Sequence, residues 1–123
     1  MSASRDTPPD VPDGVLVQSI AIDEHGREAG YRIHADGRYE SLPLGGRWEE
    51  GAKLGPERLA AVEHAIESVP LDGLAGRYEN PDDPQLLWMQ VAQGGRTRTV
   101  SVAGNRRVPE LERLTALLTD AFR

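Results

Sequence analysis

Apolar and polar residues alternate through residues 31–41, on either side of a central Asp-Gly pair. This pattern predicts a β-hairpin, and two loop lengths compete for its register. A two-residue loop places Ile33 opposite Glu40, whereas a three-residue loop with Gly37 in the left-handed conformation places Ile33 opposite Tyr39. A slip by one residue would invert the apolar face, so we expect the three-residue loop. That register also pairs Tyr31 with Ser41, Arg32 with Glu40 and His34 with Arg38.

Three further segments are typical of strands. Residues 15–22 are rich in β-branched and apolar residues, and residues 85–92 and 97–103 flank a Gly94-Gly95 pair that favours a turn. A two-residue loop at these glycines sets a self-consistent register for the second hairpin. Its apolar pairs are Leu87 with Val102 and Met89 with Val100.

Two other segments carry apolar residues at helical spacing, and each opens with a proline. The first helix is expected to begin at Pro56, with Gly55 as its cap, and to run to about Val69, where Pro70 stops it. The second is expected to begin at Pro109. The apolar stripes that predict packing on a sheet are Leu59, Val62, Ala65, Ile66 and Val69 in the first helix, and Leu111, Leu114, Leu117, Leu118, Ala121 and Phe122 in the second.

The order of these elements is βββαββα. It predicts an α+β domain with an antiparallel sheet of about five strands and both helices on one face of the sheet. Between residues 42 and 53 the chain is rich in glycine, and a short strand around residues 47–49 is the regular element expected there. Residues 1–14 contain three prolines and three aspartates, a composition that predicts a disordered tail. Residues 15–123 then form a single domain.

Composition narrows the classes of function. The chain has 123 residues, a formal net charge of −6 and no cysteine. Negative charge disfavours nucleic-acid binding through a basic surface, and the lack of cysteine excludes disulfides, thiolate nucleophiles and cysteine-ligated zinc. No segment approaches the roughly 18 apolar residues of a membrane span, and the start lacks the apolar run of a secretory signal. We therefore expect a cytoplasmic protein, monomeric by default, with no nucleic-acid or membrane partner.

No catalytic or metal-binding motif stands out in the sequence. His25, His34 and His64 lack metal-ligand spacing, and we expect them to be solvated. The serines lack a G-x-S-x-G setting, and the paired glycines lack the helix and lysine of a phosphate-binding loop. The acidic run at residues 79–83 does not have EF-hand spacing. These observations predict no catalytic residue, no metal site and no cofactor.

Aromatic residues give the strongest indication of a binding surface. Trp48, Tyr78 and Trp88 lie in or beside irregular segments, and loops on a rigid sheet often carry recognition residues. Core packing is the competing interpretation for at least one tryptophan. We take the three aromatic residues as candidates for contact with a partner protein.

Four motifs follow one another along the chain: Tyr31-x-Ile33-x-x-Asp36-Gly37-x-Tyr39, Leu54-x-Pro56-x-x-Leu59, Thr99-Val100-Ser101-Val102 and Pro109-Glu110-Leu111-x-x-Leu114. In these motifs the chain resembles the emfourin-like small bacterial domains, which include a proteinaceous inhibitor of thermolysin-like metallopeptidases and related domains of unassigned function. At residues 21–24 it has Ala-Ile-Asp-Glu, where the inhibitor has a glycine-rich start. The resemblance implies an α+β fold without catalytic residues and a metallopeptidase as partner.

Two functions therefore remain open at the level of sequence. The first is a non-catalytic protein-interaction module, with peptidase inhibition as its specific form. The second is a small-ligand-binding or enzymatic domain that uses a cleft between the sheet and the helices. In that second case Arg32, His34 and Glu40 would supply the polar groups of the site.

Overall fold

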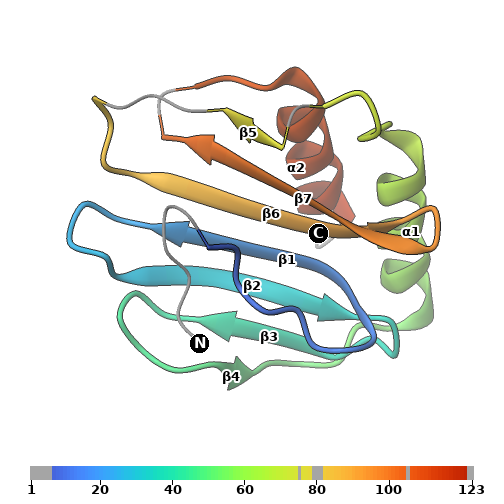
Figure 1. Ribbon diagram of the computed structural model, residues 1–123. Helices are drawn as coiled ribbons and strands as arrows, with labels where there is room; N and C mark the ends of the chain where they lie inside the picture. Colours follow the sequence, from blue (N-terminus) through green and yellow to red (C-terminus); the bar gives the residue numbers. More distant parts are fainter. Residues whose placement is uncertain (1–6, 75, 79–81, 105, 122–123) are drawn as a thin grey trace.

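The computed structural model describes residues 7–74, 76–78, 82–104 and 106–121, and these residues form an α+β fold of one sheet and two helices (Figure 1). The α+β class is thus as predicted. The strands are β1 (Val15–Ile22), β2 (Glu28–His34), β3 (Tyr39–Leu42), β4 (Glu49–Glu50), β5 (Arg77–Tyr78), β6 (Leu86–Gln93) and β7 (Arg96–Ala103), and the helices are α1 (Pro56–Ser68) and α2 (Pro109–Ala121).

The sheet is larger than the sequence predicts, and it is mixed. Its strand order is β4-β3-β2-β1-β6-β7-β5, so seven strands replace the expected five. The expectation of a wholly antiparallel sheet is wrong at one edge, where β5 pairs with β7 in parallel. A strand of two residues is too short to show alternation, and its pairing depends on how the chain returns from α1. At the other edge, β4 overlaps the short strand expected around residues 47–49.

Both predicted hairpins have the expected register. Ile33 pairs with Tyr39 and Arg32 with Glu40, and Gly37 has a positive φ of 94°. In the second hairpin Met89 pairs with Val100, as expected from the two-residue loop. Because side chains alternate between the faces of a strand, these registers fix which residues share a face.

The two helices cover one face of the sheet, behind the strands in the view of Figure 1. Helix α1 begins at Pro56 with Gly55 at its N-cap, and α2 begins at Pro109, as predicted. The predicted position of Phe122 lies outside the described residues. The largest buried side chains of this core include Val17, Ile33, Met89 and Val91 from the strands, and Val62, Leu114 and Leu118 from the helices.

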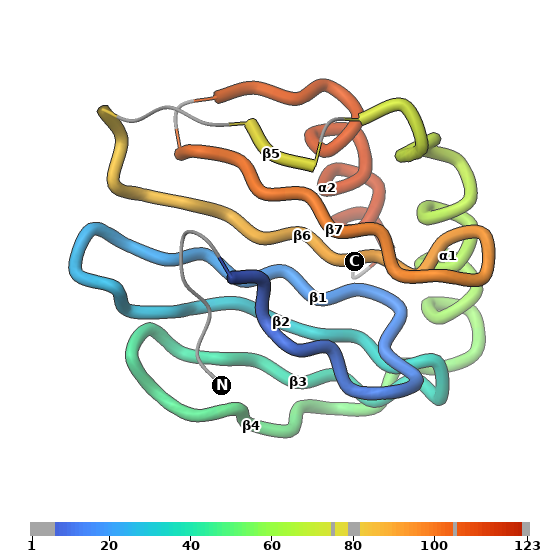
Figure 2. Tube along the Cα trace, viewed as in Figure 1, coloured from blue at the N-terminus to red at the C-terminus, as the bar shows by residue number. Residues whose placement is uncertain are grey.

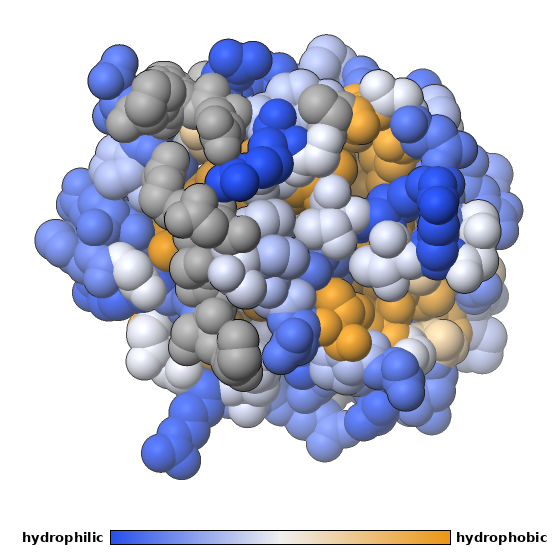
Figure 3. Space-filling view, in the orientation of Figure 1, coloured by the Kyte–Doolittle hydropathy of each residue, from blue (hydrophilic) through white to orange (hydrophobic). Residues whose placement is uncertain are grey.

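The opposite face, which we call the open face, has no helix over it. A smaller apolar cluster of Ile22, Leu86 and Trp88 lies there. Residues 7–14, which we call the strap, run in front of this face before the chain turns back into β1 (Figures 1 and 2). Of the tail expected over residues 1–14, residues 1–6 lie outside the described residues; the strap lies on the sheet, and Pro9 is buried. Figure 3, which looks onto the open face, shows hydrophobic residues between hydrophilic ones.

Candidate functional site

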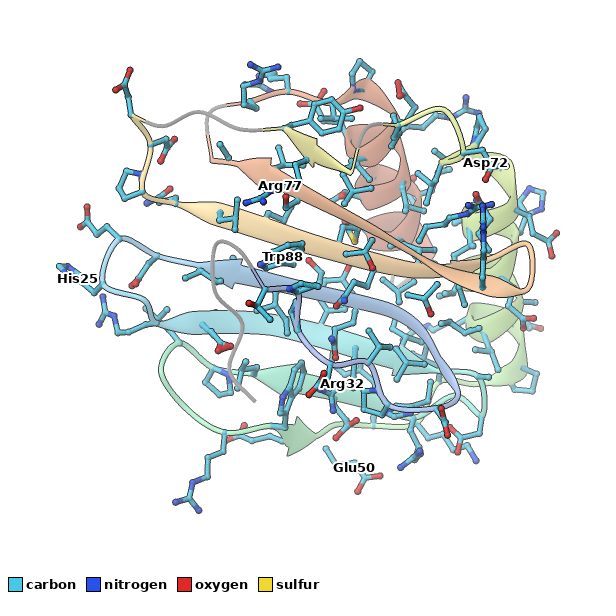
Figure 4. All side chains as sticks on the ribbon, in the orientation of Figure 1. His25, Arg32, Glu50, Asp72, Arg77 and Trp88 are labelled. Atoms are coloured by element: carbon cyan, nitrogen blue, oxygen red, sulfur yellow. The ribbon has the colours of Figure 1, made fainter. Side chains whose placement is uncertain are left out.

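Four polar side chains form a row across the open face. Gln90 of β6, Gln18 of β1, Arg32 of β2 and Glu40 of β3 are successive partners in the sheet register. Gln18 Nε2 donates to Gln90 Oε1 at 3.0 Å, and Arg32 Nε donates to Gln18 Oε1 at 2.8 Å. Arg32 Nη1 lies 3.6 Å from Glu40 Oε1. Figure 4 shows Arg32 on this face, with Glu50 beyond it at the β4 edge.

The strap meets the polar row at its glutamine end. Gln90 Nε2 donates to the carbonyl oxygen of Pro9 at 2.8 Å, and Gln18 Nε2 donates to that of Asp10 at 3.0 Å. The two glutamines are 4% and 0% exposed, although they lie on the face without helices. A buried amide must find partners, and here those partners come partly from the strap.

His34 is buried, so the expectation that all three histidines are solvated is wrong at this position. It is 4% exposed, whereas His25 and His64 are exposed. His34 Nε2 bonds to Glu40 Oε1, and Arg38 Nη2 lies 3.1 Å from His34 Nδ1. A guanidinium can only donate, so Nδ1 accepts from Arg38, and the N–H at Nε2 donates to the Glu40 carboxylate. Both ring nitrogens are therefore occupied, and neither is placed to take a proton from a substrate.

Charge pairing and burial affect the ionisation of this row in opposite directions. The hydrogen bond from His34 lowers the pKa of Glu40 below its ordinary value of 4.5, with Arg32 and Arg38 acting in the same direction. Burial lowers the pKa of Arg32, and Glu40 partly offsets that effect. Both groups remain charged at neutral pH because their ordinary pKa values lie far from 7. Glu40 is thus a carboxylate held by cationic and hydrogen-bonding neighbours.

Trp48 packs against Arg32, the third residue of the row. The Arg32 guanidinium carbon is 3.7 Å from the centre of the Trp48 ring, a close cation–π contact. Trp48 is half-buried, and it lines a hollow with Leu42 and residues 45–47 from its own segment and residues 26–28 from the β1–β2 turn. Leu44, in the same connection, is 55% exposed and is the most exposed large hydrophobic side chain in the described part of the chain.

The structure does not bring the three predicted aromatic residues together. Tyr78 packs at the edge of the core beneath the helices, whereas Trp88 belongs to the apolar cluster of the open face. Trp88 is 3% exposed, so its ring is occupied by core packing in this structure. Contact of these residues with a partner stays a prediction; Trp48 lines a hollow at the surface.

Arg32, His34 and Glu40 do come together, but on the face of the sheet away from the helices. Ile33 lies between Arg32 and His34 in β2 and packs in the helix-covered core, so its two neighbours point the other way. A cleft between the sheet and the helices therefore does not contain them. Sequence alternation identified this face correctly, but it gave no sign of the glutamines that join it, because Gln18 and Gln90 are 72 residues apart.

Within residues 7–74, 76–78, 82–104 and 106–121, no three His, Asp or Glu side chains are grouped to hold a metal ion. Residues 79–81 of the acidic run lie outside these ranges. Among the same residues no helix is long and apolar enough to cross a membrane. Comparisons of the chain with protein-family models and with curated proteins find no match.

Proposed function

We propose that the protein is a non-catalytic protein-interaction module that recognises its partner through the β3–β4 loop, residues 43–48. The observation that carries the proposal is an exposed apolar side chain on a fixed loop. Leu44 is 55% exposed, and Leu42, Gly45 and Trp48 of the same segment line a hollow. Apolar and aromatic anchors of this kind dominate the binding energy of protein interfaces.

The loop is held by two backbone hydrogen bonds, both donated by residues that follow Leu44. The amide of Gly45 donates to the Glu28 carbonyl at 3.0 Å, which ties the loop to β2, and the amide of Gly46 donates to the Pro43 carbonyl at 2.8 Å. Arg32 fixes the Trp48 ring from the sheet below. A fixed loop loses little conformational entropy on binding, which favours affinity.

The contacts of His34, next to the polar row, support a non-catalytic role. General acid–base chemistry needs a group within reach of a substrate proton. His34 has both nitrogens bonded to Glu40 and Arg38 and is 4% exposed. These contacts supply both ring nitrogens of His34 with partners inside the molecule, which supports a binding role for the protein.

The resemblance to emfourin-like domains makes a thermolysin-type metallopeptidase the first partner to test. Hydrolysis of a fluorogenic peptide by such an enzyme should fall as the protein is titrated in, and Leu44→Asp should raise the required concentration about tenfold, the effect of losing one interface anchor. Ala61→Asp, on an exposed position of α1, is the matched control and should leave inhibition unchanged. No inhibition at stoichiometric concentration would exclude this class of partner.

A pull-down with the same three baits tests the wider proposal. A protein captured by the wild-type chain and by Ala61→Asp, but not by Leu44→Asp, would support recognition by the loop. Equal capture by all three baits would place recognition elsewhere. Recovery of no protein would contradict an interaction module of any kind.

A further inference from the structure

The strap is held to the open face through its backbone carbonyls. Two amides on neighbouring strands, Gln90 and Gln18, donate to the consecutive carbonyls of Pro9 and Asp10 at 2.8 and 3.0 Å. Both glutamines are at most 4% exposed; the Gln90 bond to Pro9 is buried, and the Gln18 bond to the exposed Asp10 is partly buried. These amides bind backbone carbonyls, so the two hydrogen bonds do not depend on which side chains the strap carries.

At the glutamine end of the row, the side-chain N–H groups donate to the strap, whereas the side-chain oxygens accept hydrogen bonds from within the row. Gln90 Oε1 accepts from Gln18, and Gln18 Oε1 accepts from Arg32. A surface that presents N–H groups suits a chain with many carbonyls and few amide protons. Proline has no N–H, and residues 8, 9 and 12 of this chain are proline. Proline-containing chains are also extended before binding, so they lose less entropy when they dock.

The strap can leave this site without breaking the sheet. Residues 8–12 have no regular secondary structure and form no ladder with a strand. The β1 pairs with β2 and with β6 are complete without them. Without the strap, Gln18 Nε2 keeps its bond to Gln90 Oε1, and both amides can donate to the carbonyls of another extended segment.

We propose that the open face, at Gln18 and Gln90, is a binding site for an extended, proline-containing segment of another protein, and that the strap occupies it as a tethered competitor. This site uses residues other than those of the 43–48 loop. Its failure would therefore leave the function proposed above intact, and the converse also holds.

A tethered segment has an effective concentration in the millimolar range, so a free peptide competes poorly with an intact strap. The test therefore uses the full chain with Pro9→Gly, which removes the buried ring and loosens the strap without altering the sheet. The probe is a fluorescein-labelled peptide with the wild-type sequence of residues 7–14. Anisotropy measures its affinity, and the side-chain amide signals of Gln18 and Gln90 in nitrogen-15 NMR spectra report where it binds.

The peptide should bind the Pro9→Gly chain about tenfold more tightly than the wild-type chain, and it should shift both glutamine amide signals. Adding Gln90→Met should weaken binding at least tenfold, whereas Gln85→Met, at an exposed glutamine just before β6, should not. The proposal is overturned if the peptide does not bind, if it binds both chains equally, or if Gln90→Met has no effect.

Two further outcomes are also decisive. If the Gln90→Met chain does not fold, the glutamine signals of the Pro9→Gly chain decide, because a bound peptide must shift them and unshifted signals overturn the proposal. Light scattering on the wild-type chain should give the mass of one chain. A dimer that disappears with Pro9→Gly would assign the site to the strap of a second copy and would contradict a partner segment.

Discussion

Gly30 of β2 lies so close to Ser19 of β1 that a Cβ atom at position 30 would stand 1.9 Å from the Ser19 carbonyl oxygen. No real side chain tolerates such a distance, so the close approach of the two strands here requires glycine. Gly30 pairs with Ile20, two positions along from the pair of Gln18 with Arg32. The absence of a side chain at Gly30 thus helps to fix the spacing at which the polar row forms.

Gly30→Ala should therefore destabilise the fold by about 3 kcal/mol, the upper range for inserting one carbon into a packed site, because the atom it meets belongs to the backbone. Gly73→Ala is the matched control, since nothing lies within 4 Å of a Cβ there. It should change the free energy of unfolding by less than about 0.5 kcal/mol. Urea unfolding of both variants makes the comparison, and equal effects would contradict the steric explanation.

The parts of the fold that follow from local chemistry were predictable. An Asp-Gly pair with Gly37 left-handed set the first hairpin, and prolines at positions 56 and 109 marked the helix starts. Each of these signals acts within a few residues, where alternation or helical spacing fixes the geometry. The pairing of Arg32 with Glu40 followed from the same reasoning.

The candidate site depended on contacts that no local pattern encodes. Gln18 and Gln90 read as ordinary polar positions of two strands, and their burial comes from a register between distant segments and from the strap. The strap itself has the composition of a disordered tail. It is bound through backbone carbonyls, which every residue has, so its sequence carries no signal of this contact.

Two turn glycines, Gly37 between β2 and β3 and Gly26 between β1 and β2, allow the energetic cost of backbone strain to be measured apart from that of steric contact. Gly37 and Gly26 both have positive φ, at 94° and 79°, but only at Gly37 would a Cβ also meet a backbone atom, the Leu54 carbonyl oxygen at 2.9 Å. Gly26→Ala should cost about 1 kcal/mol from the left-handed conformation alone. Gly37→Ala should cost about 1 kcal/mol more. Thermal or urea unfolding measures both, and equal losses would show that residues 53–54 adjust without cost.

Arg32 should be the most sensitive side chain of the polar row, because it contacts Gln18, Glu40 and Trp48. Arg32→Met keeps much of the side-chain volume but leaves the buried Gln18 Oε1 without its donor, which should cost about 2 kcal/mol. Trp48 fluorescence should shift as the ring loses the guanidinium. Arg47→Met, at an exposed arginine of the adjacent loop, should leave stability unchanged. If both variants unfold at the same urea concentration, Arg32 does not stabilise the polar row.

Because the pKa of Glu40 is lowered, the stability that its negative charge contributes should depend on pH. Hydrogen bonding to His34 lowers the pKa below 4.5, so the folded state binds fewer protons than the unfolded state at mildly acidic pH. The stability that this gives is complete above the ordinary pKa and is lost as the pH falls through the folded one. Glu40→Gln keeps a hydrogen-bond acceptor but removes the charge, so it should cost about 1 kcal/mol at pH 7. The difference from wild type should shrink steadily below pH 4.5 in urea unfolding.

Glu24→Gln, at a side chain 60% exposed, should show no such convergence. A Glu40→Gln deficit that stays constant down to pH 3 would mean that shape, and not charge, is what Glu40 contributes.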